Sequence, residues 1–446
     1  MSTKTILFIV PGAYPLGGIA TWLDYIVPGV ECAGFHAVVG LVDGVHHQAD
    51  KYLSRHPFRN HVKIRNQTGT KEGRIRKLQR VLADQQADLI VVVNIPDTYL
   101  AVERLDSKWQ TNVKVVMTMH AIQQDMLCDI RRYKHVIDAV VCTNRLGCAL
   151  AIEYAEMIED GTYYAPYGVS VGSEPLKSKP NDILRIVYSG RFEPVQKRVR
   201  DIPRILNKLN SLNFGYEFVF VGAGAEEEHL RNALKGPAFG KKVKFLGILA
   251  QKELTKLYHR SDILLVTSEW ETGPMVAWEA MANGLALVSS DYVGSGLERS
   301  LVNGENALLF PVGDVERAAH CLIRLRSASL FRQIASNGYR LVRKRYSEHL
   351  SIERWLDSFN RILERSSERK RVQESRLEVA GRLDRLVGTS SAETIRSMLR
   401  RKYIHAEPGG EWPHSHSRSS GDETFLDYAR RVDRAIQSDG VVSIVH

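Results

Sequence analysis

The sequence of 446 residues lacks any long hydrophobic run and contains few cysteines. Its longest apolar runs, such as Ile6–Val10 and Leu89–Val93, span about five residues, whereas a helix that crosses a bilayer needs about 20. The five cysteines are scattered and form no Cys-x-x-Cys pair, which argues against a disulfide framework and against a structural zinc site. The N-terminal apolar stretch is too short for a signal peptide and predicts a buried strand, so we expect a cytoplasmic protein.

The net charge of +10 is modest, and half of it lies in residues 320–364, where nine basic residues face four acidic ones. Attraction to an anionic inner membrane face is one interpretation of this stretch, and a solvated helical surface is the other. No recognised nucleic-acid-binding motif accompanies the charge, so we expect no nucleic-acid partner.

Short apolar runs alternate with helical patterns twice along the chain, which predicts two α/β domains with parallel sheets. We place the first domain at 1–175 and the second at 181–346, joined by a Gly-, Ser- and Pro-containing linker at Val171–Asn181. An amphipathic helix is expected at 347–364. The remaining segment, 365–446, is a basic extension that we expect to be helical in part and disordered over His405–Gly421.

The segment with the strongest functional signal is Ser261–Asp314. It predicts a strand, a turn, a helix that begins at Pro274, and a second strand, so that the turn lies at the carboxyl end of a parallel strand. Glu271 falls just before this helix and Glu279 within it. This stagger suits two parts of one extended ligand better than an acid/base pair acting on one bond.

Further candidate residues follow other predicted strands. Arg191 and Lys197 come after a strand that ends at Ser189, and two cations at such an edge suit a diphosphate. The paired glycines Gly17 and Gly18 follow the first strand, where backbone N–H groups can approach an anion. This loop is neither Gly-x-Gly-x-x-Gly nor a Walker loop, which argues against dinucleotide and ATP use. Other residues at strand ends are His120, Gly222 and Glu298.

In this order, the motifs resemble those of the family 4 glycosyltransferases, which are retaining enzymes of the GT-B fold. The resemblance spans about 1–364 and is most specific over 185–315. It includes Gly190-Arg191 with Lys197, the strand that ends at Gly222, and the Glu-x7-Glu motif from Glu271 to Glu279. The chain departs from the family pattern in four places: Thr272-Gly273 replaces a Gly-aromatic pair, and Tyr167 stands where Asn is common. Asn94 stands where a histidine often occurs, and Ala286 where a proline is usual.

The resemblance implies two Rossmann-like domains that face a central cleft, an acceptor-side domain first and a donor-binding domain second. Arg191 and Lys197 would bind the donor diphosphate, Glu271 and His120 the transferred sugar, and Glu279 the ribose. The implied catalytic residues are Arg191, Lys197, Glu271 and His120. The implied donor-binding positions are Gly17, Gly18, Gly190, Gly222, Gly273, Pro274, Met275, Val276, Glu279 and Glu298.

The implied activity is retaining transfer of a sugar from a UDP- or GDP-linked donor to a lipid-linked or surface-polysaccharide acceptor. The family uses no divalent metal, the chain has no Asp-x-Asp motif, and we expect no cofactor. Two alternatives stay open: another enzyme on the same fold, a sugar-nucleotide epimerase or a phosphorylase, and a degenerate, non-catalytic scaffold.

Overall fold

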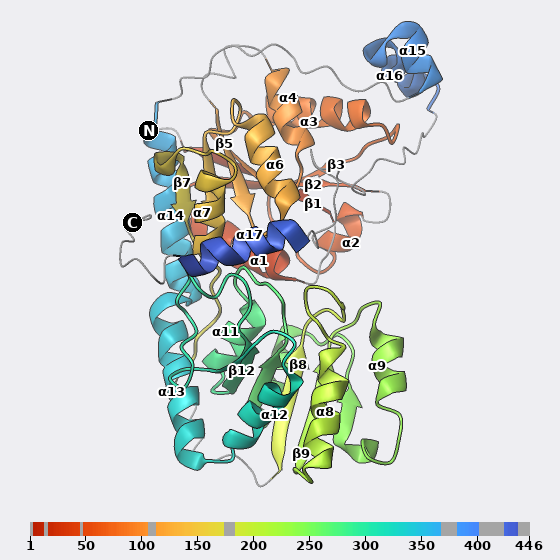
Figure 1. Cartoon of the computed structure of the whole chain (residues 1–446). Coiled ribbons are helices and arrows are strands. Elements are labelled where there is room, and N and C mark those ends of the chain that lie inside the picture. Colours follow the sequence, from red (N-terminus) through yellow and green to blue (C-terminus); the bar gives the residue numbers. More distant parts are fainter. Residues whose placement is uncertain are drawn as a thin grey trace.

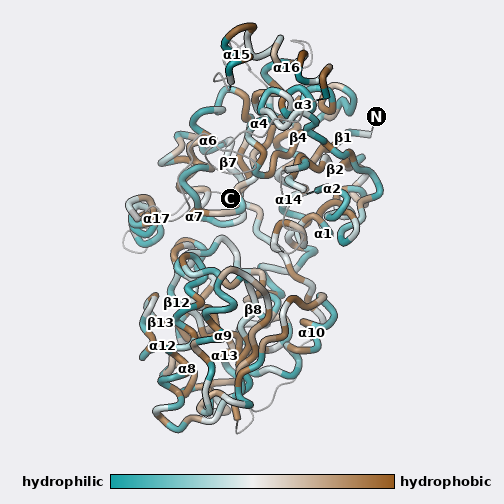
Figure 2. Tube along the Cα trace, turned by 90° about the vertical axis from the view of Figure 1, so that its right-hand side faces the viewer, coloured by the Kyte–Doolittle hydropathy of each residue, from teal (hydrophilic) through white to brown (hydrophobic). Residues whose placement is uncertain are grey.

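The computed structural model describes residues 3–12, 17–44, 48–105, 113–173, 183–366, 381–400 and 423–435. Two α/β domains lie one above the other, and a long helical segment runs along one side of both (Figure 1). Hydrophobic residues gather on the inner strands of each domain, and the outer helices alternate between hydrophobic and hydrophilic residues (Figure 2). No helix of the described ranges is long and apolar enough to cross a membrane.

The N-terminal domain is built on a parallel seven-stranded sheet in the order β3-β2-β1-β4-β5-β6-β7. Its central strand β1 is apolar after Thr5 because helices cover both faces of a parallel sheet. The strands are β1 (Thr5–Pro11), β2 (His36–Val42), β3 (His61–Ile64), β4 (Leu89–Val92), β5 (Lys114–Met119), β6 (Ala139–Cys142) and β7 (Thr162–Tyr164). The helices are α1 (Gly18–Cys32), α2 (Ala49–Leu53), α3 (Lys71–Gln85), α4 (Asp97–Glu103), α6 (Gln124–Tyr133) and α7 (Arg145–Glu153).

The second domain contains a parallel six-stranded sheet in the order β10-β9-β8-β11-β12-β13. Its strands are β8 (Leu184–Ser189), β9 (Tyr216–Val221), β10 (Val243–Phe245), β11 (Ile263–Val266), β12 (Ala286–Ser290) and β13 (Leu308–Phe310). Its helices are α8 (Asp201–Ser211), α9 (Glu227–Ala233), α10 (Gln251–Arg260), α11 (Met275–Ala282), α12 (Val315–Arg324) and α13 (Ala328–Arg345). In both sheets the strand order reverses beside the first strand of the domain, where ligands of open α/β sheets bind.

Helix α14 (Glu348–Glu364) returns from the second domain to the first (Figure 1). Its buried residues Trp355 and Phe359 pack against Trp22 of α1 and Phe8 of β1. The Ser347 side chain accepts a hydrogen bond from the Leu350 N–H and caps the helix. The amphipathic pattern at 347–364 therefore forms a helix that joins the cores of both domains.

The sequence prediction missed the edge strands β3 and β7, which have only four and three residues and contain polar side chains. Each of these strands is defined by its pairing with a neighbouring strand, which sequence periodicity does not reveal.

In the C-terminal extension, the structure has α15 (Arg382–Val387), α16 (Thr389–Met398) and α17 (Glu423–Ala435). The expected disorder at 405–421, and the linker from residue 174 onward, lie outside the described residues.

Helix α17 packs on α7 of the N-terminal domain and also binds the second domain. The Asp433 carboxylate accepts hydrogen bonds from the backbone N–H groups of Gly294 (2.7 Å), Gly296 (3.1 Å) and Leu297 (2.9 Å). Nearby, Arg430 pairs with Glu269 at 2.7 Å. The C-terminal extension thus links the two domains beside the loop that leads to Glu271.

Asp433→Ala is expected to weaken the docking of α17 by about 2–4 kcal/mol, because three N–H groups lose a charged acceptor. Hydrogen exchange should then report faster exchange of the amides in α17. Asp427→Ala is the matched control, since exposed Asp427 pairs only with Arg430 of the same helix within the described residues. Equal protection of α17 in the Asp433 variant and the wild type would contradict this role.

Candidate active site

The carboxyl edge of the second sheet brings the predicted cations together. Gly222, which follows β9, lies so close to β8 that a Cβ atom there would fall 1.9 Å from the Gly190 carbonyl oxygen. This close approach requires glycine and directs the chain outward into the loop that carries Arg191 and Lys197. The Arg191 guanidinium is exposed and donates to the Gln196 side chain at 2.7 Å.

Lys197 and Glu271 form the central ion pair of this edge, with Nζ and Oε1 2.5 Å apart. The Glu271 side chain is 8% exposed and the Lys197 side chain 17% exposed, so the pair is largely shielded from water. Ser268 also donates to Glu271 Oε1 at 2.6 Å. Glu271 is therefore fixed in position by two donors, and its second oxygen Oε2 carries no hydrogen bond to a described residue.

The loop that presents Lys197 is itself held by Glu193. The Glu193 carboxylate accepts hydrogen bonds from the backbone N–H groups of Val195 (2.8 Å), Gln196 (2.6 Å) and Lys197 (3.0 Å). Sequence reasoning missed Glu193, although a carboxylate two to four residues before unpaired N–H groups is a recognised local signal.

Helix α11 begins at the same edge, one residue later than expected, with Pro274 as its N-cap. No side chain caps this N-terminus, so its first N–H groups are available to an anion. Gly18, at the start of α1 in the other domain, faces it: a Cβ atom on Gly18 would lie 3.2 Å from Met275 Sδ. The neighbouring Gly17 is the N-cap of α1, and a Cβ there would meet nothing within 4 Å.

Glu279 lies in α11 and is partly buried. Burial raises the pKa of Glu279 to about 7; the hydrogen bond from Gln251 Nε2 at 3.2 Å lowers that pKa, and the nearby Glu348 raises it. A carboxyl with this pKa changes its charge near neutral pH, so any ligand affinity that depends on its charge changes with pH in this range.

His120 follows β5 in the N-terminal domain and is 7% exposed. Its Nδ1 shares a 2.7 Å hydrogen bond with the Tyr167 hydroxyl, and its backbone oxygen accepts from Thr272 Oγ1 at 2.8 Å. Burial lowers the pKa of His120 to about 3, so the ring is neutral at physiological pH. Its Nε2 atom is buried without a hydrogen-bond partner, which leaves one polar atom for a ligand.

Two of the residues that depart from the family pattern, Thr272 and Tyr167, therefore both contact His120. Gly273 is adjacent, since a Cβ there would lie 3.4 Å from the Tyr167 ring. Sequence reasoning did not assign a role to Tyr167 or Thr272, and their separation in the sequence gave no signal of this convergence.

The structure places Glu298 at the junction of the two domains, 4% exposed. Its carboxylate accepts hydrogen bonds from the hydroxyls of Tyr164 and Tyr346 and from the Arg145 N–H. Because these donors come from both domains, Glu298 helps to join the domains. Its assignment to donor binding stays a prediction.

Two contacts bring predicted positions of both domains together: Gly18 lies against Met275, and the His120 backbone accepts from Thr272, next to Glu271 and Gly273. The remaining predicted positions lie on the elements described above. They are Gly17 in the first domain, and Gly190, Arg191, Lys197, Gly222, Pro274, Val276 and Glu279 in the second. The arrangement offers two cations and open N–H groups for a diphosphate, and carboxylates for hydroxyl groups on either side.

Residues 174–340 match the family model described as glycosyl transferases group 1. Over 130 residues the chain is 30% identical to glycogen synthase of Mycobacterium tuberculosis. This match covers 29% of the chain and 31% of that enzyme. The amylovoran biosynthesis glycosyltransferase AmsK of Erwinia amylovora is 31% identical over 116 residues, 25% of this chain and 28% of AmsK. The chain thus spans under a third of the length of these curated relatives.

Among solved structures, the chain resembles Alr3699/HepE of Anabaena in complex with UDP and glucose, with a TM-score of 0.64 and 18% sequence identity. That likeness covers 80% of this chain and 99% of HepE. The chain therefore has the GT-B fold, and its second domain carries the sequence pattern of the group 1 glycosyl transferases.

Proposed function

We propose that the protein is a glycosyltransferase that moves a sugar from a UDP- or GDP-linked donor to a lipid-linked or surface-polysaccharide acceptor. The observation that carries the proposal is the shielded Lys197–Glu271 pair beside Arg191 and the uncapped start of α11. The family match over 174–340 includes all four features, and HepE binds UDP and glucose on the same fold. The epimerase, phosphorylase and scaffold alternatives have no observation of their own in favour.

In the proposed reaction, Arg191 and Lys197 stabilise the negative charge that develops on the leaving nucleotide diphosphate. Two cations supply this charge, so we propose that transfer needs no metal ion or other cofactor. Glu271 is held by Lys197 and Ser268, and this suits an acceptor of sugar hydrogen bonds better than an attacking nucleophile. We therefore propose same-face departure and attack, which retains the anomeric configuration.

The acceptor assignment rests on the resemblance described above and on the name of AmsK, an amylovoran biosynthesis glycosyltransferase. We also propose peripheral association with an anionic inner membrane face, because α13 exposes the cations Arg340, Arg343 and Lys344. Arg345 is engaged with Glu298 and is not included.

Thermal-shift screening against UDP-, GDP-, ADP- and CMP-sugars tests donor binding. A ligand at 100 times its dissociation constant should stabilise the protein by about 2.7 kcal/mol. We expect one nucleotide class to stabilise the wild type and to lose this effect in the Arg191→Ala, Lys197→Ala double variant. No stabilisation by any of these donors, or equal stabilisation of the double variant, would contradict the proposal.

Tyr167→Phe is expected to lower kcat/KM for transfer by about tenfold and to leave the Kd for the free nucleotide unchanged. The variant keeps the ring packing but releases His120 Nδ1, so the imidazole loses its fixed orientation. Tyr163→Phe is the matched control, because Tyr163 is also buried but does not contact His120 through its hydroxyl. An unchanged kcat/KM, or an equal loss of nucleotide affinity, would argue against this role.

A further inference from the structure

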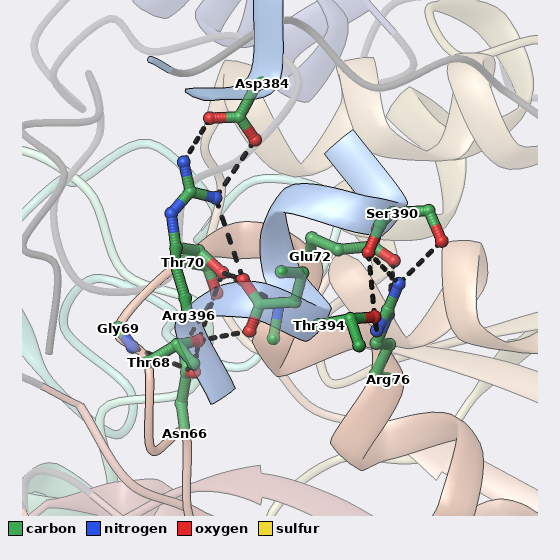
Figure 3. A network of polar contacts seen from close by, with 12 residues as sticks. Asn66, Thr68, Gly69, Thr70, Glu72, Arg76, Asp384, Ser390, Thr394 and Arg396 are labelled. Atoms are coloured by element: carbon green, nitrogen blue, oxygen red, sulfur yellow. Dashed lines mark hydrogen bonds and ion pairs between the residues drawn. The ribbon is translucent and has the colours of Figure 1, made fainter. Parts of the chain in front are cut away.

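The C-terminal helices α15 and α16 dock on the N-terminal domain through polar side chains (Figure 3). Arg76 of α3 donates to the Ser390 carbonyl and hydroxyl oxygens at 2.6 Å and to Thr394 Oγ1 at 3.1 Å. Within the docked segment, Arg396 pairs with buried Asp384. The extension is therefore fixed against the loop after β3 and the first turns of α3.

Both oxygens of the Glu393 carboxylate accept hydrogen bonds from the N-terminal domain. The residue is 3% exposed, and the donors are Thr68 Oγ1 at 2.5 Å and Thr70 Oγ1 at 2.6 Å. Gly73 makes room for it, because a Cβ there would lie 2.6 Å from Glu393 Oε1 and 2.2 Å from Thr68 Oγ1. The negative charge of Glu393 is thus buried between α16 and the loop before α3.

Beside the junction lies a pocket of about 240 Å³ with a strongly basic lining. Five cationic side chains line it, and Glu393 is the one carboxylate among its lining residues. The five cations are Lys63, Arg65, Arg76, Lys77 and Arg80. Asn66, Gln67 and Ser397 add neutral hydrogen-bonding groups.

Three of the cations are partly neutralised by carboxylates outside the pocket lining. Lys63 and Arg65 pair with Asp50 at 2.5 and 2.7 Å, and Arg76 pairs with Glu72 at 2.7 Å. Lys77 and Arg80, one turn apart on α3, have no hydrogen bond or ion pair to any residue that the structure describes. Two such cations beside one pocket repel each other, and an anion bound between them would offset this repulsion.

We propose that this pocket, formed by β3, α3 and α16, binds a phosphate group. Arginine and lysine at a concave site, with neutral donors between them, suit the several oxygens of a phosphate or diphosphate. The source of that group is either a soluble phosphate ester or the headgroup of an anionic lipid. Helix α16 completes the site, which gives the C-terminal extension a binding role.

The pocket is separate from the candidate active site. Helices α15 and α16 lie at the end of the N-terminal domain away from the second domain (Figure 1), whereas Arg191 and Lys197 belong to the second domain. The inference therefore stands independently of the proposed transfer reaction.

Calorimetry with inorganic pyrophosphate on the full chain tests the site. We expect saturable binding by the wild type and by the Arg191→Ala, Lys197→Ala variant, in which the cleft cations are gone. In a Lys77→Ala, Arg80→Ala variant the affinity should fall by about tenfold or more, because two charge-assisted contacts are lost. Lys241→Ala, Lys244→Ala is the matched control, which removes the same charge from exposed positions of the second domain that have no binding role.

Flotation with phosphatidylcholine vesicles, with and without phosphatidylglycerol, separates the two sources. Vesicle binding that needs phosphatidylglycerol, Lys77 and Arg80 would identify a lipid headgroup; pyrophosphate binding without such flotation would identify a soluble phosphate ester. The Lys77, Arg80 variant should keep the wild-type Tm and its stabilisation by nucleotide sugar. The site is refuted if the wild type binds neither probe, or if this variant binds both as the wild type does.

Discussion

Lys197→Ala is expected to lower kcat/KM for sugar transfer by about 10²–10³-fold. The variant removes a cation from the leaving diphosphate and also leaves Glu271, 8% exposed, with Ser268 as its remaining described donor. Because one side chain serves both the diphosphate and the sugar-binding carboxylate, kcat should fall together with donor affinity. Steady-state kinetics, combined with the Kd of the free nucleotide, measure the two effects.

Arg200→Ala is the matched control for Lys197→Ala. Arg200 ends the same loop, and its exposed side chain pairs with Glu226 at 2.6 Å, away from Glu271. This control should keep transfer within about threefold of the wild type, as surface pairs contribute little. Transfer by the Lys197 variant at the level of the Arg200 variant would remove Lys197 from the reaction.

The second large effect is a pH dependence of donor binding set by Glu279. Its pKa of about 7 means that the ionised carboxylate, the better acceptor for ribose hydroxyls, forms as the pH rises through neutrality. Donor affinity should therefore rise about tenfold per pH unit below pH 7 and level off above it. In Glu279→Gln the affinity should be low and independent of pH between about 6 and 8, because His120, with a pKa of about 3, stays neutral there.

Stability without ligand should change in the opposite sense. Glu279 has a higher pKa in the folded chain than in the unfolded chain, so the folded state holds the proton more strongly. Its contribution is therefore most favourable below the unfolded pKa and is lost as the pH rises toward 7. Glu279→Gln should be more stable than the wild type at pH 8 by about 1–3 kcal/mol, as measured by urea unfolding.

Glu348→Gln is the control for both measurements on Glu279. Burial also raises the pKa of Glu348, and its charge in turn raises that of Glu279. The control should keep the pH-dependent affinity, with its midpoint moved to lower pH. A flat profile in Glu348→Gln combined with a wild-type profile in Glu279→Gln would show that the wrong carboxyl had been assigned.

Local patterns were enough to predict the strand–turn–helix unit from β11 to α11. A continuous apolar strand, a Pro near the first helical position and a Gly after the last one each depend on neighbours in sequence. The Lys197–Glu271 ion pair joins residues 74 positions apart, and spacing alone could not give it. The parallel sheet made it foreseeable that both residues lie at one edge, but not that they touch.

The partners of His120 and Glu298 were beyond prediction for a different reason. Both residues lie at the junction of the two domains, and the mutual placement of the domains decides what they contact. Asp433 and Glu393 are similar cases, since each comes from a polar extension whose own pattern does not name the surface that it covers. Tertiary contacts of this kind carry no periodic signal in the sequence.

A crystal structure of the protein soaked with the nucleotide sugar that stabilises it tests the central claim most directly. The account predicts the diphosphate against Arg191, Lys197 and the first N–H groups of α11, with sugar hydroxyls at Glu271 and ribose hydroxyls at Glu279. Donor density elsewhere, with this edge of the second sheet empty, would contradict it.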